Sequence, residues 1–238
     1  MGLTVFYTLR HPTPLADAKA RSLVGRLREA IREAGVPGVS RLIRVVPDFP
    51  LAHEWVELPE GDGGSVHVDV PPETGHLFRV DVGQDCEPLL LGLCRFPATV
   101  VYRGRKLRTY RSRCWRLRYF CKTQYASLHG WEHFLRCHRF VIESLLTARR
   151  LGFDVKIRDE GGYWPRHSEM ILRQRLGEMN GIIAAMGGAL KDTSDSPSVQ
   201  SPIFRHPNFE HLEHQGAEAL GVRLQKAARA IRRAAQQP

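Results

Sequence analysis

The sequence predicts an α+β protein: an N-terminal β-α-β unit that continues into an antiparallel sheet, followed by a helical section and a tethered C-terminal helix. Three observations predict this class. Strand, helix and strand patterns follow one another in the first 46 residues, and short apolar runs broken by turn residues fill the middle of the chain. From about residue 130 onward, the apolar residues recur at helical spacing.

The β-α-β unit is the most clearly patterned part. Residues 3–9 are β-branched and aromatic, which is typical of a strand. Thr13-Pro14 provides an N-cap and a first-turn proline for a helix that ends at Gly35 and Pro37. A second strand follows at 41–46, and we expect it to run parallel to the first, the usual geometry of such a crossover.

The middle of the chain predicts an antiparallel sheet. Four short strands are expected, at 65–70, 77–82, 89–94 and 98–103, because proline and glycine interrupt the chain between them. Residues 114–120 fit two patterns. Alternation of apolar and basic residues favours a strand, whereas Tyr110, Cys114, Leu117 and Cys121 would share one face of a helix. We favour the strand.

The remainder is expected to be helical. One helix runs from about Gly130 to Gly152, a short segment follows, and a second helix closes at Gly187-Gly188. We therefore divide the chain into four parts by residue number: a sheet domain 1–127 with a basic stretch 95–122, a helical section 128–190 packed on it, a flexible linker 191–208 and a C-terminal helix 209–238.

Composition predicts a cytoplasmic protein that does not enter a membrane. The 238 residues contain no apolar run near the ~20 residues of a membrane span, and the N-terminus has no signal-peptide pattern. Five cysteines without a Cys-x-x-Cys pair indicate reduced thiols.

Positive charge is concentrated in mid-chain. Residues 88–131 contain ten Lys or Arg residues and no Asp or Glu, so this stretch accounts for the whole formal net charge of +10. Lysine and arginine neutralise phosphates, and aromatic faces stack exposed bases. The leading hypothesis is therefore a non-enzymatic or accessory nucleic-acid-binding protein, and the sequence leaves open whether it is an enzyme. Its candidate binding residues are Arg103, Arg105, Lys106, Arg108, Arg111, Arg113, Trp115, Arg116, Arg118, Tyr119 and Lys122.

Two alternatives account for the same charge without nucleic acid. In the first alternative, the arginines are solvated strand residues and the aromatic residues belong to the core, as in many intracellular proteins. In the second alternative, the protein is an assembly subunit whose basic surface meets an acidic protein partner. Salt-dependent nucleic-acid binding, or co-purification with one acidic protein, distinguishes these hypotheses.

A separate motif predicts a metal-dependent hydrolase. Residues 129–133 spell His-x-x-Glu-His, in which two histidines bind zinc and the glutamate acts as general base. The motif resembles that of the inverted zinc peptidases. This resemblance implies zinc as cofactor, His129 and His133 as ligands, Glu132 as the catalytic residue and a downstream glutamate, for which Glu210 lies at a compatible distance, as the third ligand. The alternative is a chance match among eleven histidines.

Overall fold

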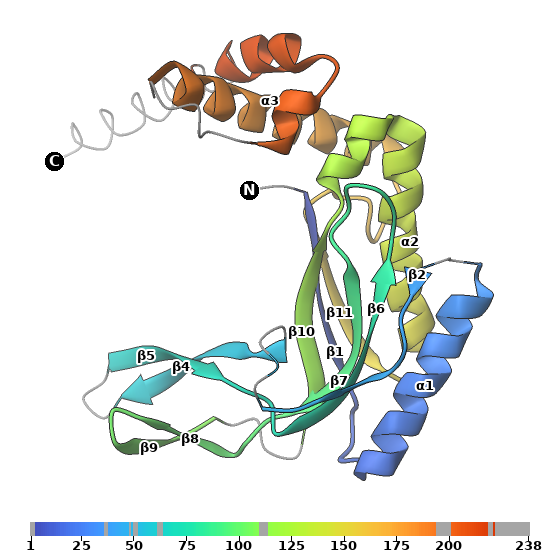
Figure 1. Ribbon diagram of the computed structural model, residues 1–238, viewed down its shortest axis with the longest axis vertical. Coiled ribbons are helices and arrows are strands. Elements are labelled where there is room, and N and C mark those ends of the chain that lie inside the picture. Colours follow the sequence, from blue (N-terminus) through green and yellow to red (C-terminus); the bar gives the residue numbers. More distant parts are fainter. Residues whose placement is uncertain are drawn as a thin grey trace, which may run out of the picture. The chain divides into compact units, whose positions relative to one another are not determined.

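The computed structural model describes residues 3–35, 38–47, 49, 52–60, 64–109, 114–193, 201–218 and 221. Both helices and antiparallel sheet are present, with a strand-helix-strand start and a helix toward the C-terminus, which confirms the predicted α+β class (Figure 1). The elements in chain order are β1 (Thr4–Arg10), α1 (Asp17–Glu33), β2 (Gly38–Val39), β3 (Ile43–Val45), β4 (Glu54–Glu60), β5 (Gly64–Val70), β6 (Thr74–Asp81), β7 (Leu89–Arg95), β8 (Thr99–Tyr102), β9 (Arg105–Arg108), β10 (Trp115–Lys122), η2 (Gln124–His129), α2 (Trp131–Arg150), β11 (Asp154–Asp159), α3 (Glu169–Thr193), η3 (Pro202–Arg205) and a helix at 209–218.

Contacts between residues divide the chain into two compact units. The sheet unit consists of Val5–Cys121 and Arg136–Arg158, and the helical unit consists of Met1–Thr4, Lys122–Leu135 and Asp159–Pro238. In the described residues no helix has the length and apolarity needed to cross a bilayer.

The sheet unit is built on one sheet with the strand order β11-β1-β10-β7-β6-β2, and β3 also pairs with β6. Strand β10 is antiparallel to β7, β7 to β6, and β6 to β2. Backbone hydrogen bonds from His11 to Trp115 and from Thr123 to Leu3 show that β1 and β10 are also antiparallel. The predicted second strand at 41–46 corresponds to β3, which is antiparallel to β6 as β2 is. Strand β3 therefore runs in the same direction as β1, as expected.

Helices α1 and α2 lie over the same face of this sheet (Figure 1). Helix α1 buries Ala20, Val24, Leu27 and Ile31, which recur at the spacing of one helical face. Strand β7 is buried at all positions from Leu89 to Cys94, as a central strand requires. The side chains of β1 alternate: Val5, Tyr7 and Leu9 are buried, whereas Phe6 and Thr8 are half-buried. We call the face that carries Phe6 and Thr8 the outer face.

Two antiparallel ribbons, β4–β5 and β8–β9, project from one end of this sheet (Figure 1). Strand β4 was not predicted, because its glutamates and Pro59 are unusual in a strand. An edge strand tolerates them, since it pairs on one side only. The predicted strand at 98–103 exists as β8, but in the described residues it pairs only with β9 rather than with the main sheet. The strand favoured for residues 114–120 is confirmed as β10, which spans Trp115–Lys122.

In the helical unit, α3 passes through Gly187 and Gly188, so the prediction that the helix closes there is wrong. These glycines permit close packing instead of ending the helix. A Cβ atom on Gly187 would lie 2.9 Å from a ring carbon of Phe204, and one on Gly216 would lie 1.8 Å from the carbonyl oxygen of Gly181.

The predicted linker and C-terminal helix are described only in part. Residues 191–193 end α3, residues 202–205 form η3, and residues 209–218 are helical. Residues 194–200, 219–220 and 222–238 lie outside the described residues.

Candidate nucleic-acid interface

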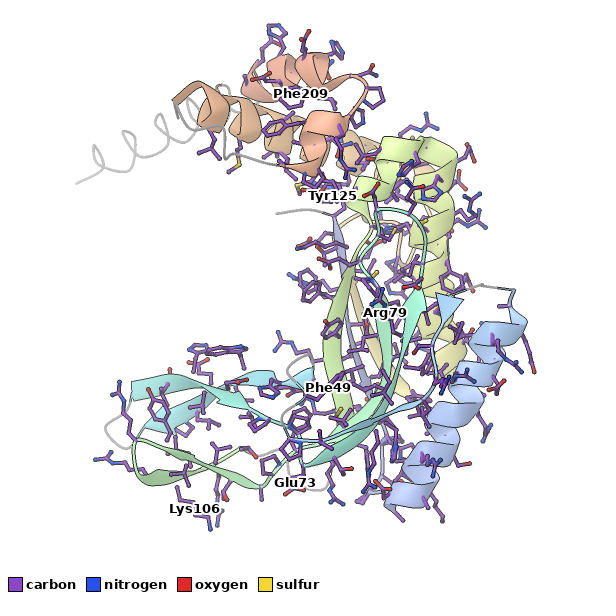
Figure 2. All side chains as sticks on the ribbon, viewed as in Figure 1. Phe49, Glu73, Arg79, Lys106, Tyr125 and Phe209 are labelled. Atoms are coloured by element: carbon purple, nitrogen blue, oxygen red, sulfur yellow. The ribbon has the colours of Figure 1, made fainter. Side chains whose placement is uncertain are left out.

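The predicted basic residues form two separate groups. Arg103, Arg105, Lys106 and Arg108 lie on the β8–β9 ribbon, where all four are exposed. Figure 2 shows Lys106 on this ribbon. No acidic residue occurs between 99 and 108. We call this ribbon, 99–108, the basic ribbon.

The second group lies on β10. Arg118 is exposed, and Tyr119 and Lys122 are half-buried. Arg116 is different because its Nε lies 2.8 Å from Glu54 Oε1, and its side chain is only 16% exposed. Its charge is therefore matched by a carboxylate of β4. Arg111 and Arg113 lie outside the described residues.

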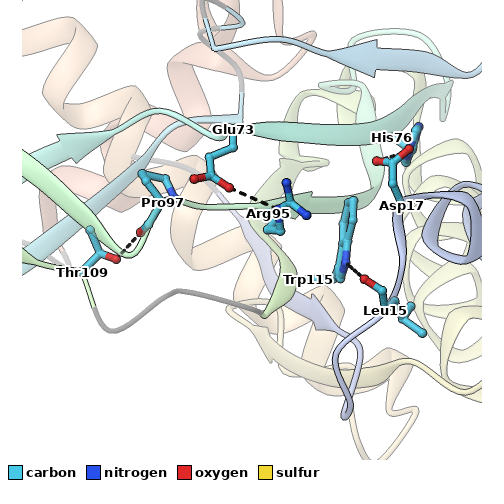
Figure 3. A network of polar contacts seen from close by, with 8 residues as sticks. All are labelled: Leu15, Asp17, Glu73, His76, Arg95, Pro97, Thr109 and Trp115. Carbon is cyan, nitrogen blue, oxygen red and sulfur yellow. Dashed lines mark hydrogen bonds and ion pairs between the residues drawn. The ribbon is translucent and has the colours of Figure 1, made fainter.

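Trp115 is not available to stack a base, because its side chain is 0% exposed. Its indole Nε1 donates a hydrogen bond to the Leu15 carbonyl at 2.8 Å, and its ring stacks on His76 with a centroid distance of 6.0 Å (Figure 3). The guanidinium of Arg95 lies 5.8 Å from the Trp115 ring and pairs with Glu73 at 3.2 Å. Trp115 thus belongs to the core, as one sequence alternative allowed.

The outer face of the sheet carries a groove of about 550 Å³, lined from β1, β10 and β11. Lys156 and Arg158 contribute cations from β11, next to Arg118 of β10. Both are exposed and alternate with the buried Val155, so they project to the side of the strand opposite the core. The groove therefore has three cations from two strands in addition to Arg116, which pairs with Glu54.

Aromatic rings of β1 and β10 lie in contact with one another next to this groove. Phe6 of β1 and Phe120 of β10 have ring centroids 6.0 Å apart, and Tyr119 stacks on Phe120 at 5.2 Å. The Arg158 guanidinium lies 4.2 Å from the Phe6 ring centroid, within the range of a cation–π interaction. Aromatic and cationic groups are therefore in direct contact on one surface.

A second groove, of about 520 Å³, lies where the β4–β5 ribbon meets the sheet. His53, Trp55 and His67 line it from the ribbon side, and it shares Phe6 and Arg118 with the first groove. The Trp55 side chain is 69% exposed, which is unusual for the largest aromatic residue. We call the two adjoining grooves the corner.

The corner is positively charged because four cations, Arg116, Arg118, Lys156 and Arg158, and one carboxylate, Glu54, line its two grooves. Glu54 pairs with Arg116, Asp69 contacts His53 Nδ1 at 2.7 Å, and Asp154 pairs with Arg10 at 2.5 Å. Within the described chain, Arg118 and Lys156 make no ion pair.

Tyr119 lines both grooves. Burial raises the pKa of its hydroxyl above the ordinary value, and the charge of Glu87 contributes in the same direction. The hydroxyl therefore stays protonated at neutral pH and can donate to an anionic ligand.

The His-x-x-Glu-His motif spans two helical elements. His129 ends η2, Gly130 has a φ of 91°, and His133 lies in the first turn of α2. The two imidazole rings still come together, with centroids 5.3 Å apart. Glu132 and Glu210 are exposed, and the described residues contain no group of three or more His, Cys, Asp or Glu side chains arranged to hold a metal ion. The zinc hypothesis thus rests on two adjacent histidines.

Sequence reasoning missed several residues of the corner, among them Phe6, Trp55, Phe120, Lys156 and Arg158. Alternation within 154–159 was the available signal for the two cations, because it places them together on one side of a strand. No local signal distinguishes Phe6 from its buried neighbours, since exposure depends on which face the helices cover.

Comparison with known proteins finds no matching family model, no matching curated protein and no matching solved structure.

Proposed function

We propose that this chain binds nucleic acid, using the corner and the basic ribbon. The observation that carries the proposal is the corner itself, where Arg118, Lys156 and Arg158 stand beside the rings of Phe6 and Phe120. Cations attract the phosphate backbone and aromatic rings accept base faces, so the two kinds of group suit the two parts of a nucleotide. Binding of an acidic protein partner would account for the cations but not for the aromatic rings beside them.

The electrostatic contribution to binding is measured by how steeply the binding constant K falls with salt concentration. Each neutralised phosphate changes the slope of log K against log salt concentration by about 0.9 for duplex DNA and about 0.7 for a single strand. Three corner cations therefore contribute a slope of about 2 on a single strand. The four cations of the basic ribbon contribute about 3 more if all of them contact phosphates.

The test is a salt titration of binding to labelled single-stranded and duplex DNA and RNA by fluorescence anisotropy. The variant with Arg118, Lys156 and Arg158 replaced by alanine should lower the single-strand slope by about 2. A matched control replaces Lys19, Arg21 and Arg26 by alanine. These three exposed residues of α1 lie on the helical side of the sheet and carry the same total charge.

Two results would overturn the proposal. One is the absence of binding to any of the four nucleic acids at low salt. The other is an equal loss of affinity in the corner variant and the α1 control, since this would mean that net charge alone, not the corner, attracts the ligand.

A further inference from the structure

We infer that the corner takes a single strand, with unstacked bases against its rings and phosphates on its cations, and that it is tolerant of base sequence. This inference rests on the proposed function and specifies its substrate. In a duplex, the base faces are already stacked on their neighbours and the phosphates lie outside. Aromatic rings beside cations can stack only with bases that are not already stacked in a duplex, that is, with the bases of a single strand.

The rings that line the second groove come from two parts of the fold. Trp55 belongs to β4 of the projecting ribbon, whereas Phe6 and Phe120 belong to neighbouring strands of the sheet. All three line the same groove of about 520 Å³. A base that enters this groove has an exposed indole on one side and the sheet rings on the other, which is the environment that planar apolar rings favour.

The size of the grooves also favours a single strand. Volumes of about 550 and 520 Å³ fall within the range of pockets that hold small molecules, about 300–1,000 Å³, so each groove suits a nucleotide-sized group rather than a helix. The grooves adjoin through Phe6, Arg118 and Tyr119, which gives successive nucleotides a continuous path.

The cations lie where such a strand exposes its phosphates. Arg118 and Lys156 are exposed and make no ion pair within the described chain, while Arg158 is held over the Phe6 ring. Arginine in this position offers both charge and a planar group on which a base can stack. Stacking and charge do not read base edges, so the expected binding has little sequence preference.

The experiment compares one labelled oligonucleotide as a single strand and in a duplex, in both DNA and RNA form. Trp55→Ala and Phe120→Leu each remove a ring, and both should weaken single-strand binding by about 5- to 150-fold, the effect of one lost base–aromatic stack. Duplex binding should change by less than about twofold, because it does not use the rings. Trp55→Phe should restore most of the single-strand affinity.

A second readout separates contact from folding. Base stacking on an indole should quench Trp55 fluorescence when a single strand is added, and Trp55→Phe should remove this signal although three tryptophans remain. Met170→Ala is the control for loss of an exposed apolar side chain, since Met170 is 79% exposed and lies in the helical unit. It should leave both affinities unchanged.

The outcomes distinguish the inference from the proposed function. Equal affinity for single strand and duplex, or equal weakening of both by Trp55→Ala, would overturn the single-strand assignment and leave nucleic-acid binding intact. Absence of any binding would end both. Preference for RNA over DNA within the single-strand arm would show that the 2′-hydroxyl is contacted, and it supports the inference.

Discussion

Replacing Glu54 by glutamine should destabilise the protein and weaken the corner. The Glu54 side chain is only 4% exposed, and its partner Arg116 is 16% exposed at a distance of 2.8 Å. The pair joins β4 of the ribbon to β10 of the sheet, next to Trp55 and Arg118. Neutralising the carboxylate removes this ion pair from a largely buried guanidinium.

The expected cost follows from the burial of the pair. Breaking a buried ion pair by removing one partner costs about 3–5 kcal/mol. The residual exposure of Arg116 lets water reach the cation, so the lower value, about 3 kcal/mol, is expected. In a chain of this length, each kcal/mol corresponds to a change in Tm of about 2–4 °C, which gives a decrease of about 6–12 °C.

Replacing both partners gives the sharpest comparison. Glu54→Leu combined with Arg116→Met should recover most of the loss, since a hydrophobic pair of similar volume needs no counter-charge. Urea unfolding of the wild type, the single variants Glu54→Leu and Arg116→Met, and the double variant completes a double-mutant cycle, and Glu54→Gln is measured beside it. Because the chain has two compact units, two spectroscopic probes should follow the transition. A loss below about 1 kcal/mol for Glu54→Gln, or strictly additive single variants, would refute the reasoning.

Two further predictions concern the sheet and its thiols. Gly92→Ala should cost at least about 3 kcal/mol, because Gly92 has a φ of 142° and a Cβ there would lie 2.1 Å from the His76 carbonyl oxygen. Gly25→Ala, in α1 with nothing within 4 Å, should instead stabilise by about 1 kcal/mol, and thermal unfolding of the two variants checks the difference in sign. The exposed Cys114 should react rapidly with a thiol reagent at pH 8, whereas burial raises the pKa of Cys94 to about 12, so that it should react only on unfolding. Mass spectrometry of the labelled native protein decides this, and labelling of Cys94 as fast as Cys114 would contradict it.

The sequence by itself determined the periodicities of the chain. Apolar spacing placed α1 and α2, turn residues separated the strands, and the alternation of residues 114–120 placed a strand there. It also separated Arg116 and Arg118 from Trp115 and Leu117 as two faces of that strand. These results depend on local spacing, which the sequence contains in full.

Only the tertiary structure decided what each face does. Helices α1 and α2 cover the face of the sheet that carries Trp115, so this tryptophan is buried in the core. Glu54, which lies on the separate β4–β5 ribbon, pairs with Arg116. Strand order likewise placed β11 beside β1, which brought Lys156 and Arg158 to the rings of the outer face. Pairing between distant segments depends on the packing of the whole sheet, and no local pattern specifies it.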